Sequence, residues 1–188
     1  MRGTHFVAAE LVCSSACTRQ DVRGLEARVD LQKGPMLAVM FTLRADIDRL
    51  RIPFAVPPRR TDGLWRHTCF EAFLGVRGSP TYHEFNFSPS GEWAAYAFRA
   101  YRDGGPVADD KFAPSIFTQQ AADQLTVQTT IPLACLQGIQ RGDIMRIGLA
   151  AVIEAADGTL SYWAVTHPSE KPDFHHADSF ALELALPK

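Results

Sequence analysis

Apolar and polar side chains alternate along most of the chain, and this pattern predicts short β-strands that bury one face. Near the carboxyl terminus, four apolar residues take every second position and should share one face of a strand. They are Phe180, Leu182, Leu184 and Leu186. The segments with strand patterns are 6–13, 24–31, 36–43, 67–76, 82–87, 92–102, 112–118, 124–131, 144–154, 160–166 and 179–186.

Stretches rich in Gly, Pro, Asp and Ser separate these segments, and we expect turns at 89–91, 103–106, 122–123 and 157–158. Only 132–140 indicates a helical turn, because its proline suits a first helical position. The proline-rich segment 52–60 should be an ordered loop. Strands at this spacing predict an all-β fold, and we expect an antiparallel β-sandwich of about ten strands, immunoglobulin-like or jelly-roll-like.

Length and charge narrow the picture further. The 188 residues fit one domain, 1–188, with a sizeable core. The 19 basic and 21 acidic residues give a net charge of −2 without a block of one sign, which argues against nucleic acid or an anionic membrane as partner. Glu10 interrupts the apolar run near the amino terminus, and no stretch reaches the ~20 apolar residues of a membrane span. We therefore expect a cytoplasmic protein.

The cysteines Cys13, Cys17, Cys69 and Cys135 are unevenly spaced, and in a chain of this size we expect reduced thiols. Cys13 and Cys17 could be two metal ligands, but no second cysteine pair accompanies them. We therefore predict no metal site.

Charged residues interrupt two of the predicted strands. In 67–76, Phe70 and Leu74 should face the core, so Glu71 faces the other way. In 82–87, Phe85 and Phe87 should face the core, and this turns three polar residues to the opposite face. These are Tyr82, Glu84 and Asn86. If the two strands are neighbours, their acids and amide form one polar patch.

Such a patch has the chemistry of a sugar site, because carboxylates and amides take hydrogen bonds from vicinal hydroxyls while aromatic rings stack on sugar C–H faces. The aromatic residues beside it are Trp65, Tyr82 and Trp93. A solvated face whose carboxylates pair with Arg99 and Arg102 explains the pattern equally well.

The polar loop 166–178, called the late loop below, carries three histidines and two aspartates. They are His167, His175, His176, Asp173 and Asp178. Adjacent histidines point apart in an extended chain, and no ligand triad with standard spacing is present. We expect this loop to cover one end of the sandwich.

Motifs for catalysis are absent: the sequence has no Gly-rich phosphate loop, nucleophile elbow or Cys/His signature. Glu71 and Glu84 could formally be a glycosidase pair, but carboxylates on neighbouring strands are common. We therefore predict a protein that is not an enzyme.

Residues 64–74 and 82–93, together with 172–180, resemble a DOMON-like domain, a superfamily related to the family-nine carbohydrate-binding modules. The likeness runs from about Met36 to the carboxyl terminus. It is strongest to a bacterial subgroup of DOMON-like proteins, some of which occur joined to a cell-wall precursor reductase. The resemblance therefore implies a β-sandwich whose relatives bind sugars or haem, and a protein partner in cell-wall precursor metabolism.

The resemblance also implies roles for individual residues. In sugar-binding relatives a tryptophan precedes the strand glutamate by six positions, which Trp65 and Glu71 match. Glu84, with Asn86 beside it, matches the polar residue of the next strand, and Arg99 a following arginine. The second stacking aromatic of the late loop is Phe174 here rather than tryptophan.

Haem-binding relatives use an axial methionine with a histidine or lysine. Met36, Met40 and Met145 lie in strand patterns, where core packing is the ordinary role, so we expect no cofactor. A pair drawn from His67, His167 and Lys171 stays open as a haem alternative.

The primary hypothesis is a non-catalytic binding domain for a saccharide or a polyol that resembles a cell-wall precursor. The alternatives are a haem-binding electron-transfer domain and a structural domain without small ligand. The candidate ligand-binding residues are Trp65, His67, Glu71, Glu84, Asn86, Trp93, Arg99, Arg102, His167, Lys171, Asp173, Phe174 and His175.

Overall fold

The computed structural model describes residues 6–15, 21–32, 36–107 and 112–188. In these residues twelve strands form one sheet, and the strand pairs are antiparallel, so the all-β antiparallel prediction is confirmed. The strands are β1 (Phe6–Cys13), β2 (Val22–Leu31), β3 (Met36–Ala45), β4 (Cys69–Val76), β5 (Tyr82–Phe87), β6 (Trp93–Ala100), β7 (Asp103–Pro106), β8 (Ser115–Gln120), β9 (Gln124–Pro132), β10 (Ile144–Glu154), β11 (Leu160–Ala164) and β12 (Leu182–Ala185).

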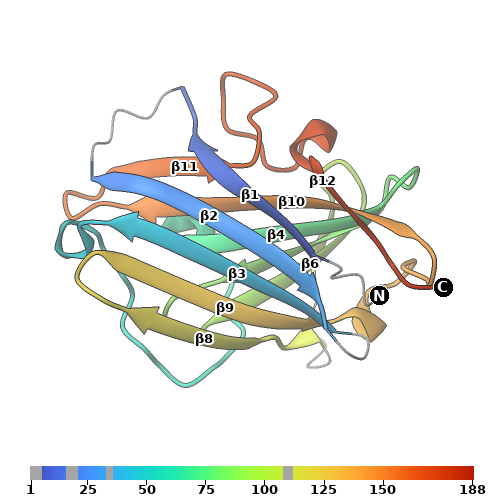
Figure 1. Cartoon of the computed structure of the whole chain (residues 1–188), viewed down its shortest axis with the longest axis horizontal. Coiled ribbons are helices and arrows are strands. Elements are labelled where there is room, and N and C mark those ends of the chain that lie inside the picture. The colour runs from blue at the N-terminus through green and yellow to red at the C-terminus, as the bar shows by residue number, and fades with distance from the viewer. Residues whose placement is uncertain (1–5, 16–20, 33–35, 108–111) are drawn as a thin grey trace.

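The sheet runs in the order β7-β6-β5-β4-β10-β11-β1-β2-β3-β9-β8, with β12 added beside β10. Its two ends fold over one another: β2, β3, β9 and β8 cross in front of β4 and β6 in Figure 1. Phe41 on β3 and Phe70 on β4 are five steps apart along this order, yet their ring centroids lie only 5.1 Å apart. The main hydrophobic core therefore lies between the two halves of the sheet.

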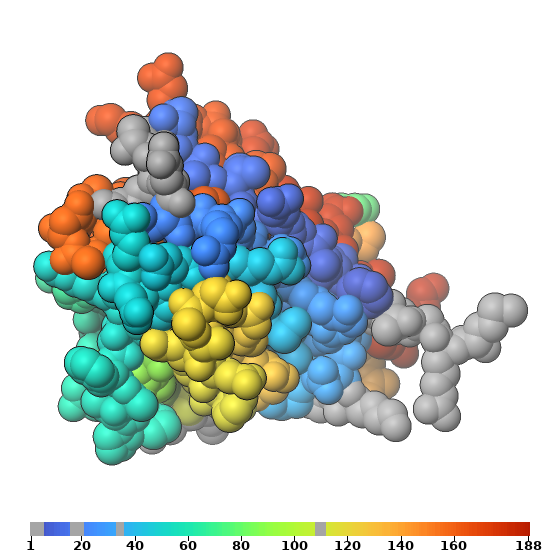
Figure 2. Space-filling model, turned by 60° about the vertical axis from the view of Figure 1, so that its left-hand side comes forward, coloured from blue at the N-terminus to red at the C-terminus, as the bar shows by residue number. Residues whose placement is uncertain are grey.

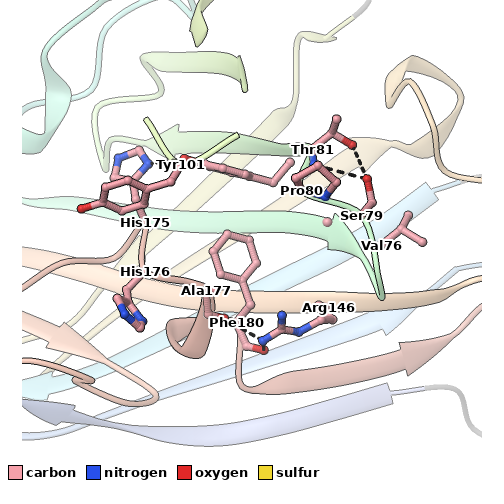
Figure 3. A pocket seen from close by; sticks show the side chains of 12 residues that line it. Val76, Ser79, Pro80, Thr81, Tyr101, Arg146, His175, His176, Ala177 and Phe180 are labelled. Atoms are coloured by element: carbon pink, nitrogen blue, oxygen red, sulfur yellow. Dashed lines mark hydrogen bonds between the residues drawn. The ribbon is translucent and has the colours of Figure 1, made fainter. Parts of the chain in front are cut away.

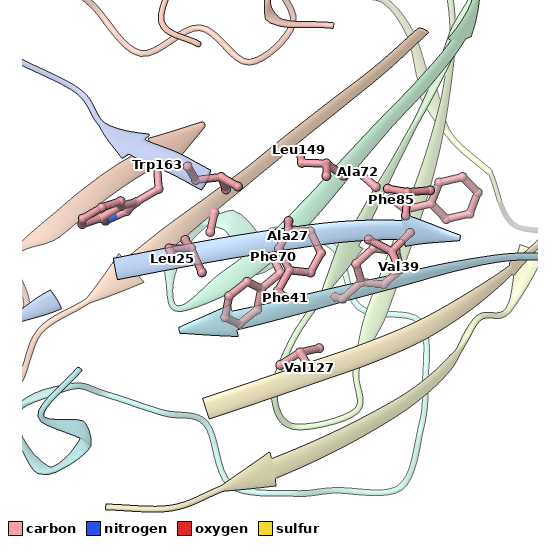
Figure 4. Packing of buried hydrophobic residues seen from close by; sticks show 14 of the residues in the cluster. Leu25, Ala27, Val39, Phe41, Phe70, Ala72, Phe85, Val127, Leu149 and Trp163 are labelled. Carbon is pink, nitrogen blue, oxygen red and sulfur yellow. The ribbon is translucent and has the colours of Figure 1, made fainter. Parts of the chain in front are cut away.

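Alternation fills this core from both sides. Figure 4 shows Leu25, Val39 and Phe41 from the front strands facing Phe70 and Phe85 from the rear strands. All five side chains are fully buried. Because every second residue of each strand points into the same space, the remaining positions of the rear strands form an outer face, which is where the polar patch was predicted.

The segment Asp103–Pro106 was predicted as a turn, and this is wrong: it is the edge strand β7, paired with β6. Glycine makes the pairing possible, because a Cβ atom on Gly104 would lie 2.0 Å from the carbonyl oxygen of Ala97. The chain reverses just before it, where Arg102 adopts a left-handed φ of 54°.

The prediction that Phe180 shares a face with Leu182, Leu184 and Leu186 is also wrong. The three leucines pack on the main core, whereas Phe180 precedes β12 and packs against Phe73 on the outer face. The short helix η5 (Ala177–Ser179) ends at Phe180 and breaks the alternation there. Three further 3-10 helices are described: η1 (Ile47–Arg49), η2 (Leu64–Arg66) and η4 (Leu133–Cys135). The last fulfils the predicted helical turn.

The loop 52–60 lies at one end of the sheet, beside the β8–β9 hairpin (teal beside yellow in Figure 2). Within the described residues, no helix has the length and apolar character needed to cross a membrane.

Cys69 and Cys135 are reduced thiols as expected, but Cys13 is disulfide-bonded, so the prediction of reduced thiols is wrong at this position. Cys17 lies outside the described residues.

Because the two halves of the sheet pack against each other, we expect Phe41→Ala to lower the free energy of unfolding strongly. The substitution removes a fully buried ring at their interface, and we expect a loss of about 3–5 kcal/mol in the free energy of unfolding, measured by denaturant titration. Phe117→Ala is the matched control, because that ring is 64% exposed on β8, and it should change stability by less than about 0.5 kcal/mol. Equal losses in the two variants would contradict this account of the core.

Candidate functional site

The outer face of β4, β5 and β6 carries the predicted polar residues side by side. Glu71 on β4 lies directly across from Asn86 on β5, and Glu84 lies across from Tyr96 on β6. This placement follows from the register, because Phe70 and Phe85 on the same strands point into the main core. The structure therefore brings Glu71, Glu84 and Asn86 together, as the alternation predicted.

A cavity of about 430 Å³ lies over this face. Its floor comes from β4, β5, β6, β10 and β11. The late loop and the helix η2 cover its sides. The lining residues are Trp65, Glu71, Glu84, Tyr96, Phe98, Arg102, Val152, Tyr162, Pro172, Phe174 and His175. The late loop thus covers part of a face of the sheet, and the loop 52–60 contributes no lining residue.

Two buried oxygen atoms have no hydrogen-bond partner among the described residues: Glu71 Oε1, from a residue that lines the cavity, and Asn86 Oδ1, from a neighbouring residue that does not. Glu71 is only 3% exposed, and Asn86 is fully buried. The amide of Asn86 donates from Nδ2 to Glu84 Oε1 at 2.9 Å, which fixes its oxygen on the other side. The floor therefore offers a hydrogen-bond acceptor, Glu71 Oε1, that lacks a donor, an arrangement that is unfavourable unless a ligand or water completes it.

Burial raises the pKa of Glu71 well above its usual value, and the neighbouring charge of Glu84 adds to the increase. Burial also raises the pKa of Glu84 to about 7, although the hydrogen bond from Asn86 and the charge of Arg102 oppose it. The two carboxyl groups consequently resist simultaneous ionisation near neutral pH.

His175 closes the cavity from the late loop. Its Nδ1 lies 2.9 Å from the hydroxyl of Tyr82, which itself accepts a hydrogen bond from the backbone N–H of Arg102 at 3.1 Å. The Tyr82 hydroxyl therefore donates to Nδ1, and we assign the ring proton to Nε2, 3.5 Å from Glu84 Oε2. Burial, with the charge of Arg102, lowers the pKa of His175 to about 4, so the ring is neutral at pH 7.

Asp173 connects the late loop to the β6–β7 turn through hydrogen bonds. Its carboxylate accepts hydrogen bonds from the Tyr101 hydroxyl at 2.6 Å, from Arg102 Nη2 at 2.8 Å and from the backbone N–H of His175 at 3.2 Å. Burial acts to raise the pKa of Asp173, but the hydrogen bonds from Tyr101 and Arg102 outweigh it and lower the pKa. The lowered pKa favours the ionised form of Asp173, which pairs with Arg102 beside the cavity.

Aromatic rings form the walls. Trp65 is 40% exposed and packs edge-on against Tyr96, with 5.8 Å between ring centroids. Phe174 lies 6.4 Å from Tyr162 and 6.5 Å from Phe73. Rings around an acceptor-rich floor suit a ligand with apolar C–H faces and several hydroxyl donors.

Two predicted residues of β6 lie elsewhere. Trp93 is buried in the main core, on the opposite face of the sheet from the cavity. The Arg99 side chain is 83% exposed and pairs with Asp103 at 2.9 Å. Arg102 takes the place expected for Arg99, because the left-handed turn at Arg102 redirects the chain toward the cavity.

Five other predicted residues do not line the cavity: Asn86 and Asp173, whose contacts are described above, and His67, His167 and Lys171. His67 forms a 2.7 Å contact with Glu154 and is largely exposed. His167 contacts the carbonyl oxygen of Val12 at 3.0 Å. Lys171 is exposed.

Five residues line the cavity but were not predicted, namely Tyr96, Phe98, Val152, Tyr162 and Pro172. A sequence signal existed for two of them, because Tyr96 and Phe98 alternate along β6 and lie across from Glu84 and Tyr82. Tyr162 gives no such signal, since its position depends on the pairing of β10 with β11.

The cavity does not fit haem. Its lining includes one histidine, His175, whose two ring nitrogens already face Tyr82 and Glu84, and it includes no methionine. Met145 lies in the main core, and Met40 lies on β3 in the other half of the sheet. Among the described residues, no cluster of three or more His, Cys, Asp or Glu could hold a metal ion.

A second cavity of about 460 Å³ adjoins the first and shares His175 with it (Figure 3). Its walls include Phe180, Pro80 and Tyr101. Arg146 donates from Nη2 to the carbonyl oxygens of Ala177 at 2.6 Å and Phe180 at 3.2 Å, so it holds the end of the late loop in place.

Comparison with known proteins gives a result at the level of the fold. No protein-family model matches the chain, and no curated protein matches it. Its fold is similar to the crystal structure of a provisionally assigned carbohydrate-binding protein from Bacteroides uniformis, with a TM-score of 0.71, 15% identity and coverage of 97% of this chain and 86% of that one. It is also similar to a family-nine carbohydrate-binding module from Caldicellulosiruptor kristjanssonii in complex with glucose, with a TM-score of 0.50, 14% identity and coverage of 93% and 82%.

The raised pKa of Glu84 predicts how stability depends on pH. A carboxyl group whose pKa is about 7 in the folded state and about 4.5 in the unfolded state stabilises the fold fully below pH 4.5. This contribution is lost as the pH rises to 7. Compared with Glu84→Gln, the wild-type protein should therefore lose about 2 kcal/mol between pH 5 and pH 8, measured by urea unfolding.

The comparison with Glu84→Gln cancels the opposite effect of His175, whose lowered pKa makes stability rise between pH 4 and 6.5. Glu10→Gln, on the exposed face of β1, should give a pH profile parallel to the wild type. Parallel profiles for Glu84→Gln and the wild type would show that Glu84 titrates normally.

Proposed function

We propose that this chain is a non-catalytic binding module for a saccharide or a similar polyol, which binds in the cavity over Glu71 and Glu84. The observation that carries the proposal is the unpartnered Glu71 Oε1, buried on the floor of a cavity with aromatic walls. A sugar hydroxyl donates one hydrogen bond, so its binding there would satisfy an atom that the protein leaves unsatisfied.

The other lining residues suit the same ligand. Trp65 is exposed enough to stack on a sugar ring, and Phe174 and Tyr162 offer a second aromatic wall. The Arg102 side chain is 52% exposed beside the cavity, where its remaining N–H groups can donate charge-assisted hydrogen bonds. The volume of about 430 Å³ lies within the ~300–1,000 Å³ typical of small-ligand sites.

The fold comparisons support this proposal, because one similar structure is a carbohydrate-binding module with bound glucose. We infer that the folded-over sheet is a β-sandwich of this type in a single domain, and that the chain is a bacterial, cytoplasmic DOMON-like protein. A partner in cell-wall precursor metabolism is the corresponding proposal for its biological context.

Titration calorimetry against glucose, cellobiose, xylose, N-acetylglucosamine and soluble cell-wall precursors tests the proposal. We expect binding by at least one of these sugars, and Glu71→Ala should weaken it at least tenfold, about 1.4 kcal/mol. Arg99→Ala is the matched control, because Arg99 lies outside the cavity and its loss should leave the affinity unchanged. If no member of the panel binds or raises the melting temperature, the protein is better described as a structural domain.

Stacking on Trp65 predicts a second effect. Trp65→Ala removes the most exposed ring of the cavity wall, and we expect a five- to tenfold weaker affinity, corresponding to about 1 kcal/mol of aromatic contact. Fluorescence titration of the wild type should show a change in tryptophan emission that Trp65→Ala lacks. Phe117→Ala, an exposed ring on β8, should bind as the wild type does. Unchanged affinity of Trp65→Ala would exclude stacking at this position.

A further inference from the structure

The ionisable groups that line the cavity are unbalanced in charge. Arg102 is its cation, and that guanidinium already forms an ion pair with Asp173 at 2.8 Å. His175 is neutral at pH 7 because its pKa is low. The two buried carboxyl groups, Glu71 and Glu84, consequently have no cation of their own among the described residues.

The hydrogen-bonding groups of the floor are also unbalanced, because acceptors outnumber donors. Glu71 Oε1 is an acceptor without a donor, and Glu84 receives the Asn86 amide and faces the His175 ring. A neutral hydroxyl brings one donor and no charge. An ammonium group brings three donors and a positive charge in a small volume, which matches a buried carboxylate pair better.

Building on the saccharide-binding function proposed above, we propose that the preferred ligand is an amino sugar with a free amine, and that its ammonium group binds against Glu71 on the cavity floor. The aromatic walls then hold the sugar ring, while the two glutamates select for positive charge. N-acetylation of the amine removes the charge and two of the three donors, so it should abolish the preference.

Binding of an ammonium group changes the proton content of the site. The groups around Glu71 that can titrate or carry charge are Glu84, Cys69, Tyr96, Tyr162, Tyr82, Arg102, Asp173 and His175. Burial raises the pKa of Glu71 well above its usual value and the pKa of Glu84 to about 7, so these two carboxyl groups hold protons that a bound cation can displace. The ammonium ion favours their ionised forms, so binding near pH 7 should release protons from the protein.

Calorimetric titration with glucosamine, glucose and N-acetylglucosamine at pH 7 tests this inference. We expect glucosamine to bind at least tenfold more tightly than the other two sugars. Buffers with different ionisation enthalpies should show proton release for glucosamine. The affinity should rise from pH 5 to 7 and then fall above the pKa of the sugar amine. Because the carboxyl groups are buried, the preference should persist in 0.5 M NaCl.

Glu71→Gln keeps the shape of the side chain and should reduce the ratio of glucosamine affinity to glucose affinity at least fivefold. Glu84→Gln is a second variant in case Glu71→Gln fails to fold, and thermal unfolding reports on both. Glu10→Gln, which removes an exposed charge on β1, should retain the full preference.

The outcomes separate the two proposals. If glucose or N-acetylglucosamine binds as tightly as glucosamine, the amine preference is overturned and saccharide binding stands. If glucosamine is preferred equally by the wild type and Glu71→Gln, the ammonium group binds elsewhere and this inference is also overturned. If none of these three sugars binds while another sugar of the wider panel does, the amine preference is overturned and saccharide binding stands. If no sugar of the wider panel binds either, both proposals fail.

Discussion

The register between β4 and β5 is the constraint on which the rest of the structure depends. Placing Glu71 across from Asn86 turns Phe70 and Phe85 into the main core and turns the acids to the outer face. A shift by one residue would bury the acids among leucines and expose the phenylalanines, which is strongly unfavourable. Packing of the main core therefore fixes the position of the polar floor, although no residue of that core lines the cavity.

Burial of two acids on one face is unfavourable for stability, and the surrounding structure reduces that penalty only in part. Asn86 donates to Glu84 but leaves Glu71 without a donor, while Arg102 is engaged with Asp173. A structural charge network would pair these groups more completely. The incomplete pairing is the physical reason for regarding this face as a binding site, because natural proteins tolerate such unsatisfied groups mainly where function requires them.

The alternation of apolar and polar residues predicted most strands and the polar face of the sheet. The prediction failed where the backbone conformation departs from simple alternation. Residues 82–87 and 144–154 were predicted with the bounds that the structure shows, and the juxtaposition of Glu71 with Asn86 followed from them. Arg102 and Arg99 could not be ranked from the sequence, because the left-handed φ of Arg102 decides which one reaches the cavity. Tyr162 enters through non-local pairing of strands, which a single sequence does not specify.

The carboxylate of Asp173 has a consequence for how the cavity responds to acid. Its lowered pKa keeps it ionised well below the pH at which the glutamates beneath it take up protons. The contacts from Tyr101 and Arg102 that anchor the late loop therefore persist while the floor loses its negative charge. Acidification from pH 8 to pH 5 thus alters the electrostatic character of the cavity while its outline is preserved, so charge and shape are controlled by separate groups.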